Sequence, residues 1–328
     1  MSSNRVTLVT GATGLVGNNV VRLLLSRGEA VRVLARGTTD RRPLAGLNVD
    51  VYAGDVRDEA AVRQACRGTT TVIHCAAHVN VGWAHPEHYE EINVGGTRNV
   101  AIACREFAAR MIHISSTDVF GRCSLRHPTD EDTPFAGGPQ VPYVVTKRAA
   151  EGVVDDEISQ GLDAVVVNPA FMLGPWDWKP SSGRLLLAVA RGATVFAPRG
   201  WLSLCDVRDV ATGILAARDS GATGRRYLLA GKTMEWIEAC RIFADICGVR
   251  RPLMRAGPLM QMIAGRVGNV VGRVTGHEPE VNSAAVDLGR LPKNYSSVRA
   301  QRELGYYQRP VKETARDAWQ WFQEQGIR

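Results

Sequence analysis

The chain has 328 residues, of which 45% are hydrophobic, and its formal net charge at pH 7 is +7. This length suits a larger domain with a smaller partner, and the apolar share is enough for an ordinary globular core, which excludes a disordered protein. The arginines are dispersed rather than gathered in a stripe, which argues against a nucleic-acid-binding protein. A solvated basic surface explains the charge best, while an anionic ligand or contact with a membrane surface stays open.

Cysteine usage and the first residues bear on the compartment. The seven cysteines form no Cys-x-x-Cys pair, and an odd number without metal-ligand spacing indicates reduced thiols rather than a disulfide framework or a zinc site. No basic stretch followed by a long apolar segment opens the sequence, and no run reaches the ~18 apolar residues of a membrane-spanning helix. We therefore expect a cytoplasmic protein that binds no metal ion.

Strand and helix patterns alternate through the first half of the chain. Short runs rich in β-branched residues predict strands over residues 5–10, 30–35, 49–53, 71–75, 111–115 and 164–168. Helical patterns lie between them, over residues 15–27, 58–66, 87–107 and 141–160. This alternation predicts an α/β fold with a doubly wound parallel sheet.

The second half has a different character. Residues 174–180 form a loop rich in proline and tryptophan, residues 184–191 look helical, residues 202–217 run from strand into helix, and residues 226–230 form a strand. From residue 235 onward the pattern is mostly helical, and it ends with a helix over residues 314–325. We divide the chain into a unit of residues 1–172, to which residues 205–230 return, and a smaller, mostly helical unit of residues 173–204 and 231–328.

A glycine-rich loop follows the first strand and opens the first helix. Gly11 permits the tight turn, Gly14 lets the backbone approach a pyrophosphate, and Gly17 lets the helix pack closely on the sheet. The phosphates then meet free N–H groups at a helix N-terminus. The first unit is therefore expected to be a Rossmann-type dinucleotide-binding domain, and the second to bind the substrate. The expected cofactor contacts here are Thr10, Gly11, Thr13, Gly14, Leu15 and Val16.

The end of the second strand indicates which dinucleotide binds. An NAD site usually carries an acidic residue there, but this strand ends in Arg36, with Arg41 and Arg42 shortly after it. A guanidinium pairs well with the 2′-phosphate of NADP, so we expect NADP(H), with NAD as the alternative and a merely solvated loop as a third possibility. Asp55 follows the third strand, where it either meets the adenine amino group or simply ends the strand.

A tyrosine and a lysine stand four residues apart at the start of a predicted helix. This spacing places Tyr143 and Lys147 on one helix face. A free phenol has a pKa of about 10, and a nearby ammonium, helped by a positive nicotinamide ring, lowers it, so that Tyr143 exchanges a proton while hydride passes to or from the cofactor. Lys147 also donates to the nicotinamide ribose. Ser116, after the fifth strand, is the expected donor to the substrate oxygen, with Ser115 or Thr117 as substitutes if the register differs.

These motifs together give the chain a family resemblance. It resembles an extended, or atypical, short-chain dehydrogenase of the epimerase/dehydratase and dihydroflavonol-reductase-like kind. The matching segments are residues 10–17, Gly54-Asp55-Val56, Cys75-Ala76-Ala77, Asn93-Val94-Gly95-Gly96-Thr97, residues 115–121, 143–147, 168–175 and 297–306.

The resemblance carries several implications for the site. It implies that Ser116, Tyr143 and Lys147 act together, with Asn93 in support. It also implies a homodimer formed by packing two helices from each subunit. The further cofactor-binding residues that it implies are Val56, Cys75, Ala76, Ala77, Ser115, Asn168, Pro169, Ala170 and Phe171.

Two features favour a reductase over a nucleotide-sugar epimerase or dehydratase that keeps NAD bound. Sugar-nucleotide members typically carry an arginine that grips the pyrophosphate, and in residues 201–210 of this chain a leucine stands in its place. The Asn168-Pro169 pair resembles the dihydroflavonol-reductase and hydroxysteroid-dehydrogenase branches. It also resembles bacterial hopanoid-associated sugar epimerase-like proteins, which keeps the epimerase alternative open. A non-catalytic dinucleotide sensor is disfavoured by the intact trio.

The expected substrate pocket is apolar and aromatic, which favours a small hydrophobic or aromatic substrate. Its expected residues, besides Ser116, are His78, Trp83, Met172, Trp176 and Trp178; an equal alternative is that several tryptophans form a domain interface. An amphipathic helix over residues 258–274 either lies on a membrane surface, covers a lipid-like substrate or, as we favour, packs in a core or dimer interface. Residues 130–132 are expected to form a solvated acidic loop.

Overall fold

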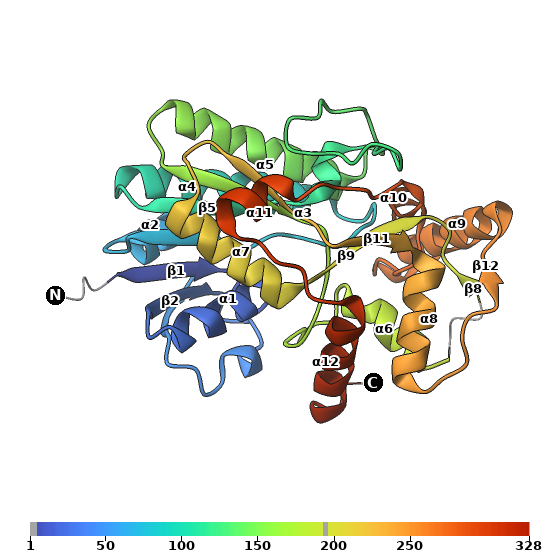
Figure 1. Ribbon diagram of the computed structural model, residues 1–328. Helices are drawn as coiled ribbons and strands as arrows, with labels where there is room; N and C mark the ends of the chain where they lie inside the picture. The colour runs from blue at the N-terminus through green and yellow to red at the C-terminus, as the bar shows by residue number, and fades with distance from the viewer. Residues whose placement is uncertain (1–4, 193–195, 328) are drawn as a thin grey trace.

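A parallel sheet forms the centre of the molecule. The computed structural model describes residues 5–192 and 196–327 (Figure 1); residues 1–4, 193–195 and 328, which belong to the predicted domains, lie outside the described residues. The sheet strands are β1 (Val6–Thr10), β2 (Ala30–Ala35), β3 (Asp50–Ala53), β4 (Thr71–His74), β5 (Arg110–Ile114), β6 (Ala164–Pro169) and β10 (Arg226–Leu229). In the described chain they lie in the order β10-β6-β5-β4-β1-β2-β3, all parallel. The doubly wound parallel α/β fold is confirmed.

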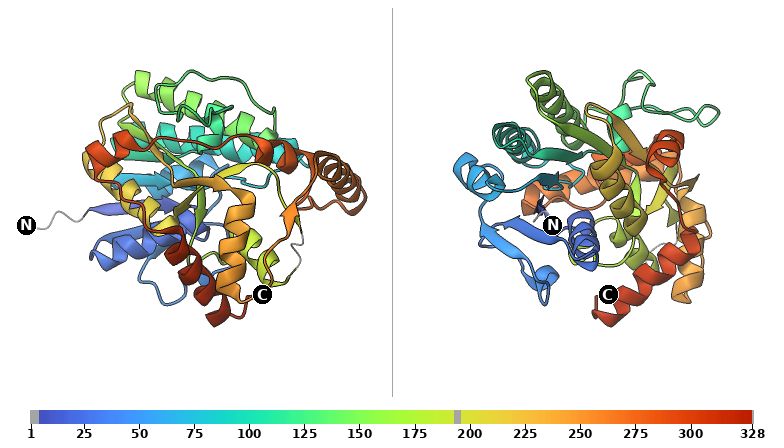
Figure 2. Two further views of the ribbon diagram at one scale, coloured as in Figure 1. Left: turned by 45° about the vertical axis from the view of Figure 1, so that its right-hand side comes forward. Right: turned by 60° about the vertical axis from the view of Figure 1, so that its left-hand side comes forward.

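Helices cover both faces of this sheet, as Figure 2 shows. One face carries α1 (Leu15–Ser26) and α7 (Val207–Ser220), and the other carries α2 (Glu59–Cys66), α4 (Gly96–Glu106) and α5 (Pro142–Ser159). The central strands are therefore apolar on both sides, and all six residues of β6 are buried. The strands run towards the right-hand side of Figure 1, so their carboxyl ends face the smaller unit.

The long helix predicted over residues 87–107 is interrupted in the structure. It consists of a short helix α3 (Pro86–Tyr89), a π-helical turn η2 (Glu90–Gly95) and α4. A π turn places an extra residue in the helix and rotates the side chains that follow, an irregularity that apolar periodicity does not reveal. Gly96 opens α4 where a Cβ atom would lie 2.7 Å from the side chain of Val56, so the helix and the loop after β3 approach closely.

The smaller unit has its own apolar core, between a three-stranded sheet and three helices. The strands β11 (Lys232–Glu235), β9 (Trp201–Asp206) and β7 (Phe171–Leu173) form the sheet, in that order. Residues of α6 (Gly183–Ala190), α8 (Trp236–Cys247) and α12 (Val311–Glu324) pack with it around Phe243 and Phe322, which are fully buried. A paired edge of β8 (Phe196–Ala197) and β12 (Met254–Arg255) leads to α9 (Pro258–Thr275) and α10 (Ser283–Arg290) at the periphery.

The border between the two units is discontinuous. Residues of α7 and β10, within the returning segment 205–230, belong to the core cluster of the large sheet. Tyr295, Ala300 and Tyr306 also pack in this cluster, although the sequence predicts residues 231–328 in the other unit. The reason is that α11 (Val298–Leu304) lies against α7 and β10 rather than against the smaller core.

One acidic residue of the loop 130–132 is buried, contrary to the expectation of a solvated loop. The Glu131 side chain is only 2% exposed, and its carboxylate accepts a hydrogen bond of 2.8 Å from the backbone N of Leu228 on the edge strand β10. Arg299 lies 3.8 Å from the same carboxylate. The prediction is therefore wrong for Glu131. Its carboxylate accepts from a backbone N–H at the edge of the sheet, and the sequence around residues 130–132 does not reveal that β10 lies beside it.

Candidate active site

The glycine loop joins β1 to α1 and leaves an open cradle. Gly11 has a φ of +67°, in the left-handed region, and a Cβ atom on it would lie 2.6 Å from the backbone N of Ala76. Gly14 is exposed and caps α1 without a side-chain hydrogen bond, and a Cβ atom there would meet nothing nearer than 3.4 Å. The first-turn N–H groups of α1 therefore lack a side-chain partner beside open space, as a bound pyrophosphate requires. The residues present fit a dinucleotide.

The other residues predicted to hold the nucleotide lie along the same sheet edge. The backbone N of Cys75 donates to the Thr10 carbonyl at 3.2 Å, and the N of Ala76 donates to Thr10 Oγ1 at 3.2 Å. This fixes residues 75–77 beside the glycine loop. The Ser115 hydroxyl, at the end of β5, is buried and has no hydrogen-bond partner within the described chain. Such an unpaired buried hydroxyl fits a site that a ligand completes.

The end of β2 is basic in the structure. Arg36 is exposed directly after the strand, whereas Arg42 forms an ion pair of 2.7 Å with Asp40. Although burial by itself would raise it, hydrogen bonds from Arg57 and the nearby charge of Arg36 hold the pKa of Asp55 below its usual value. Asp55 is thus an ionised partner of Arg57, and the charge of Arg36 also acts on it. A phosphate at this point would meet Arg36 rather than Arg42.

The three predicted catalytic side chains converge where β5 and α5 meet. Ser116 caps the 3-10 turn η3 (Thr117–Phe120), and its Oγ accepts a hydrogen bond of 3.1 Å from the N of Asp118. The Tyr143 phenol, in the first turn of α5, lies close enough to the Ser116 side chain for that hydroxyl to lower its pKa. Lys147 follows one turn later, is 4% exposed, and donates from Nζ to the carbonyl of Ile114 at 2.6 Å.

The charges of this trio differ from the sequence-based expectation. Burial raises the pKa of the Tyr143 phenol, the negative charge of Asp118 raises it further, and the nearby Ser116 side chain lowers it. Burial lowers the pKa of Lys147 to about 8, while the charge of Glu151 opposes that change. The protein's side chains by themselves therefore favour a protonated phenol, because burial outweighs any help from Lys147, whose ammonium is bonded to the β5 backbone.

Asn93 connects the loop after β4 to α5. It lies in the π turn η2 and is 1% exposed. Its Oδ1 accepts from the N of His78 at 2.7 Å, and its Nδ2 donates to Thr146 Oγ1 at 3.0 Å and to the His78 carbonyl at 3.2 Å. Since Thr146 precedes Lys147, this amide fixes the helix turn that presents the lysine. The resemblance implies a supporting role for Asn93. In the structure, its side chain joins His78 to Thr146 through these hydrogen bonds.

Two polar residues for which the sequence predicts no role extend this network to β1. His74 bonds through Nδ1 to Thr10 Oγ1 at 2.8 Å and through Nε2 to Thr97 Oγ1 at 3.1 Å. Thr97 in turn donates to the Asn93 carbonyl at 2.6 Å. Burial lowers the pKa of His74 to about 3, so its imidazole is neutral and structural. A chain of buried hydrogen bonds thus links the glycine loop to α5.

Asn168 makes its hydrogen bonds inside the protein, next to Ser116. Its Nδ2 donates to the Ser116 carbonyl at 3.1 Å and to Glu151 Oε1 at 2.6 Å. Glu151 is also within 3.3 Å of Arg226 Nε. Asn168, predicted as a cofactor contact, therefore supports the backbone of Ser116 and one wall of the Lys147 environment.

A second lysine reaches the site from the smaller unit, and no sequence motif marks it. Lys293 is 8% exposed and forms an ion pair with Asp118, the residue whose N–H binds Ser116 and whose charge acts on Tyr143. Lys293 follows α10 by three residues, so only the folding of the C-terminal segment over η3 brings it here. It partly compensates the Asp118 charge beside the phenol.

Three of the predicted substrate residues lie around this edge. His78 packs edge-on against Tyr89, with ring centroids 4.4 Å apart, and its backbone is held by Asn93. Met172 lies in β7 and is partly buried. Trp83 is 44% exposed, and its Nε1 donates to Ser283 Oγ of α10 at 2.8 Å. Trp83 thus fastens the loop after β4 to the smaller unit.

Trp176 and Trp178 lie in an aromatic cluster between the two units. Trp321 of α12 lies 5.8 Å from Trp176 and 5.2 Å from Trp178, measured between ring centroids. The Arg22 guanidinium of α1 stacks over the Trp176 ring at 3.3 Å. These contacts match the domain-interface alternative for the two tryptophans, and their predicted contact with substrate stays a prediction.

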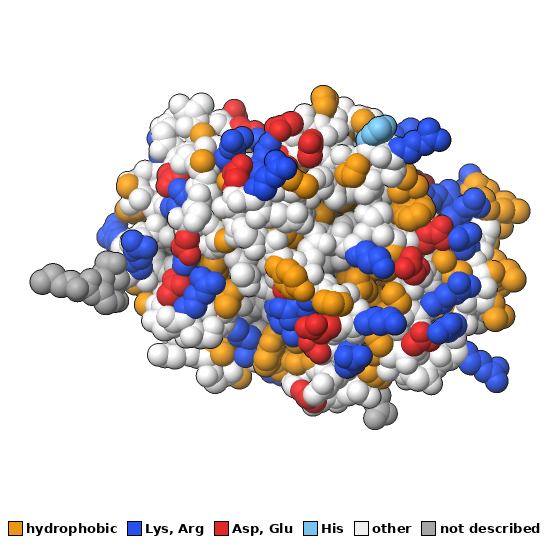
Figure 3. All heavy atoms as spheres, viewed as in Figure 1, with side chains coloured by type: hydrophobic (Ala, Val, Ile, Leu, Met, Phe, Trp, Pro, Cys, Tyr) orange, Lys and Arg blue, Asp and Glu red, His pale blue; other side chains and the backbone are white. Residues whose placement is uncertain are grey.

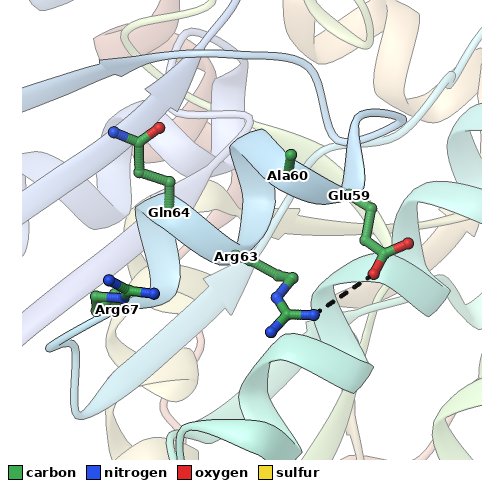
Figure 4. Close-up of a pocket in the computed structure, with 5 residues that line it drawn as sticks. All are labelled: Glu59, Ala60, Arg63, Gln64 and Arg67. Atoms are coloured by element: carbon green, nitrogen blue, oxygen red, sulfur yellow. Dashed lines mark ion pairs between the residues drawn. The ribbon is translucent and has the colours of Figure 1, made fainter.

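A hollow elsewhere on the surface does not belong to this site. Figure 4 shows it on α2, lined by Glu59, Ala60, Arg63, Gln64 and Arg67. Arg63 forms an ion pair of 3.8 Å with Glu59 across it. None of these residues belongs to the glycine loop or the trio. Among the described residues no group of three or more His, Cys, Asp or Glu side chains is placed to hold a metal ion, and all seven cysteines are free.

Comparison with known proteins places the chain in a family. The model of the NAD dependent epimerase/dehydratase family matches residues 7–230. The chain belongs to this family. It is therefore an oxidoreductase of the extended short-chain dehydrogenase type, as the resemblance predicts. Within the described residues no helix is long and apolar enough to cross a membrane.

Proteins that resemble the chain over nearly its full length carry different names. Sterol demethylase protein B of Methylococcus capsulatus is 35% identical, over 98% of this chain and 99% of that protein. The 4-hydroxy-2-methyl-3-oxo-4-farnesyl-3,4-dihydroquinoline-1-oxide ketoreductase of Stigmatella aurantiaca is 28% identical, over 95% of each chain. The crystal structure of gox2253 superimposes with a TM-score of 0.85 and 34% identity, covering 98% of this chain and 99% of that one.

Proposed function

We propose that this family member is an NADP(H)-dependent oxidoreductase that interconverts a ketone and a secondary alcohol on a small, hydrophobic or aromatic substrate. The observation that carries the proposal is the convergence of Ser116, Tyr143 and Lys147: the Ser116 side chain lies close enough to the Tyr143 phenol to lower its pKa, and the Lys147 ammonium is buried one helix turn away. These groups stand at the carboxyl edge of the sheet, where α/β proteins bind ligands. The glycine cradle lies at the same edge.

The geometry suits proton transfer to a carbonyl oxygen. In reduction, Ser116 holds this oxygen by a hydrogen bond and Tyr143 donates its phenolic proton to it, so that an alcohol forms. The nicotinamide, when bound, supplies the hydride to the carbonyl carbon, and its oxidised form adds a positive charge that lowers the pKa of the phenol. The raised pKa of Tyr143 keeps the proton on the phenol at neutral pH. Lys147 places a positive charge near the phenolate that remains.

The proposed cofactor is NADP(H), because Arg36 rather than an acidic residue ends β2. An exposed guanidinium at this point pairs with a 2′-phosphate. We expect Arg36→Glu to raise the KM for NADPH by about tenfold or more and to leave the KM for NADH little changed, since a pair of this kind contributes roughly 1.5–3 kcal/mol. Arg302→Glu, the same charge change on the exposed α11, is the matched control. Equal KM changes in both variants would remove the support for NADP(H).

The proposed substrate class rests on the residues around the trio. His78, Trp83 and Met172 offer aromatic and apolar surface with few polar anchors. Two relatives bear names that refer to a sterol and to a farnesyl-bearing ketone, which agrees with lipophilic substrates for this chain. We also propose a cytoplasmic homodimer, with residues 173–204 and 231–328 forming the main substrate side; light scattering of the purified chain tests the dimer.

A second candidate is a nucleotide-sugar epimerase or dehydratase with tightly bound NAD, which the family's description favours. Against it stands β9, where Leu202, Ser203 and Leu204 are buried and supply no arginine for a pyrophosphate. Denaturing the purified protein and identifying the released nucleotide separates the two. Stoichiometric NAD supports the epimerase, whereas an empty protein that is stabilised by NADPH supports the reductase.

The decisive test of the trio is a single-atom deletion. With NADPH and a panel of hydrophobic ketones, we expect Tyr143→Phe to lower kcat by at least about 10²-fold, because general acid catalysis is lost, while NADPH binding persists. Tyr307→Phe, on an exposed tyrosine, is the control. Turnover by Tyr143→Phe at the native rate would exclude the proposed mechanism.

A further inference from the structure

The helix α9 packs on the protein through its smallest residues. Its buried face consists of Gln261, Gly265, Gly268 and Gly272, which recur at helical spacing. A Cβ atom on Gly265 would lie 3.1 Å from the backbone of Ser283, and one on Gly268 would overlap the carbonyl of Val281. The helix therefore lies close against α10 and the turn before it. This finding excludes a place for α9 in the core of the subunit.

The opposite face of α9 is aliphatic and exposed. Residues of this face recur at spacings of three and four, and Val274 is 81% and Leu259 64% exposed. The exposed apolar residues of the helix are Leu259, Met260, Met262, Ile263, Val267, Val270, Val271 and Val274. Surface helices normally turn such a stripe towards the protein. Here the orientation is inverted, so the stripe is available to something outside the subunit.

The apolar surface continues onto the paired edge just before the helix. Leu253 is 75% exposed, and Met254 and Phe196, which are register partners in β12 and β8, are also exposed. Figure 3 shows hydrophobic side chains at the right-hand rim of the molecule, where Figure 1 places α9 and β12, with Lys and Arg side chains among them. We call this combined surface of α9, β12 and β8 the α9 face.

The α9 face is basic as well as apolar. Between Ile246 and His277 the sequence holds five arginines and no acidic residue. Two acidic groups next to it are engaged: Glu278 accepts from the N of Trp83 and of Ala84 at 2.9 and 2.7 Å, and Glu280 lies 3.7 Å from Arg184. Of the five arginines, those at 251 and 255 pair with Asp245 and Glu235. Those at 250, 266 and 273 have no acidic partner among the described residues.

We propose that the α9 face docks on the surface of a lipid bilayer that contains anionic lipids. An exposed aliphatic stripe flanked by arginines is the composition of helices that lie in the bilayer interface, where the apolar side chains enter the acyl boundary and the guanidiniums meet phosphate groups. A second copy of the chain fits less well. A two-fold contact through this face would place five arginines opposite five others, without an acidic residue from the same segment to pair them.

The position of α9 connects docking to the active site. Ala284 and Leu288 of α10, on which α9 packs, share a hydrophobic cluster with Tyr143 and Val144 of the catalytic helix. A docked α9 would therefore bring the substrate side of the trio close to the bilayer, from which a lipophilic ketone could be taken. This consequence rests on the proposed function, whereas docking itself does not.

Vesicle co-sedimentation of the full chain tests the proposal. We expect the chain to sediment with vesicles of phosphatidylcholine and phosphatidylglycerol. The bound fraction should fall several-fold as the salt concentration is raised. The double variant Val267→Asp/Val270→Asp should bind at least about tenfold more weakly, since charges replace two exposed valines that would enter the bilayer. Arg266→Gln/Arg273→Gln should weaken binding to the anionic vesicles. Val298→Asp, on an exposed valine of α11, is the matched control.

The outcomes separate the alternatives. Unchanged thermal unfolding and an unchanged NADPH-induced shift show that each variant is folded. Anionic-lipid binding that Val267→Asp/Val270→Asp removes and Val298→Asp retains supports the proposal. Absence of sedimentation with these vesicles, equal binding by all variants, or a dimer in light scattering that Val267→Asp/Val270→Asp dissociates would each overturn it. Failure of the proposed function is measured separately. Tyr143→Phe is expected to lose turnover and to keep vesicle binding, so turnover by this variant at the native rate would reject the proposed function without bearing on docking.

Discussion

The buried ammonium of Lys147 predicts a specific pH dependence of stability. Its pKa is lowered from 10.5 to about 8, with burial as the first cause. Between these two values the unfolded chain binds more protons at this lysine than the folded protein does, so the free energy of unfolding rises with pH over this window. Integration over pH 7 to 10 gives an increase of about 2–3 kcal/mol from this side chain alone, at 1.36 kcal/mol per pKa unit.

The assay compares the native chain with Lys147→Met, which keeps the length of the side chain and removes the charge. The free energy of unfolding of both proteins is measured by urea titration at several pH values from 7 to 10. The native protein should gain about 2–3 kcal/mol relative to the variant across this range, while the variant loses turnover at every pH. Groups that titrate equally in both proteins cancel in the difference. A difference that stays flat, or falls, between pH 7 and 10 would refute the assignment of a buried, destabilised ammonium.

Two further predictions concern the supports of the site. Asn93→Ala removes three hydrogen bonds and should lower the free energy of unfolding by roughly 2–4 kcal/mol and kcat by about tenfold. The control is Asn99→Ala, which removes a less buried amide with two hydrogen bonds and should lower the free energy of unfolding by about 1 kcal/mol. Thermal unfolding and NADPH turnover of both variants check this prediction. Gly17→Ala places a Cβ atom against the Gly11 carbonyl and should abolish the NADPH-induced thermal shift. The control is Gly152→Ala, which has open space around it and should leave that shift intact. An unaltered shift in Gly17→Ala would contradict the proposal that the glycine loop binds the dinucleotide.

The sequence pattern predicts an element correctly where the geometry of that element alone decides which residues it contains. The strand runs are correct to within a residue or two, since a buried parallel strand is apolar throughout and turn residues bound it. The glycine loop follows from three positions that need no side chain. Tyr143 and Lys147 share a helix face by spacing alone. Their proximity to Ser116 could not be predicted from spacing. It arises only when the sheet forms, because Ser116 follows β5 whereas Tyr143 and Lys147 lie in α5.

Other features depend on neighbours that are distant in the chain. Glu131 is buried because β10 presents an unpaired backbone N–H to it, and Lys293 reaches Asp118 because α11 lies against the large sheet. Trp176 packs with α12 and α1, which a tryptophan-rich loop does not reveal. Helical periodicity likewise describes α9 correctly as amphipathic but does not say which of its faces points inward.

The sequence by itself determined the α/β class, the conformation of the glycine loop and the shared helix face of Tyr143 and Lys147, since each follows from short-range spacing and backbone sterics. The tertiary structure alone decided the protonation preference of Tyr143 and Lys147, the network through Asn93 and the outward turn of the aliphatic face of α9. These properties arise from burial and from contacts between residues far apart in the chain, and both exist only after the elements have packed.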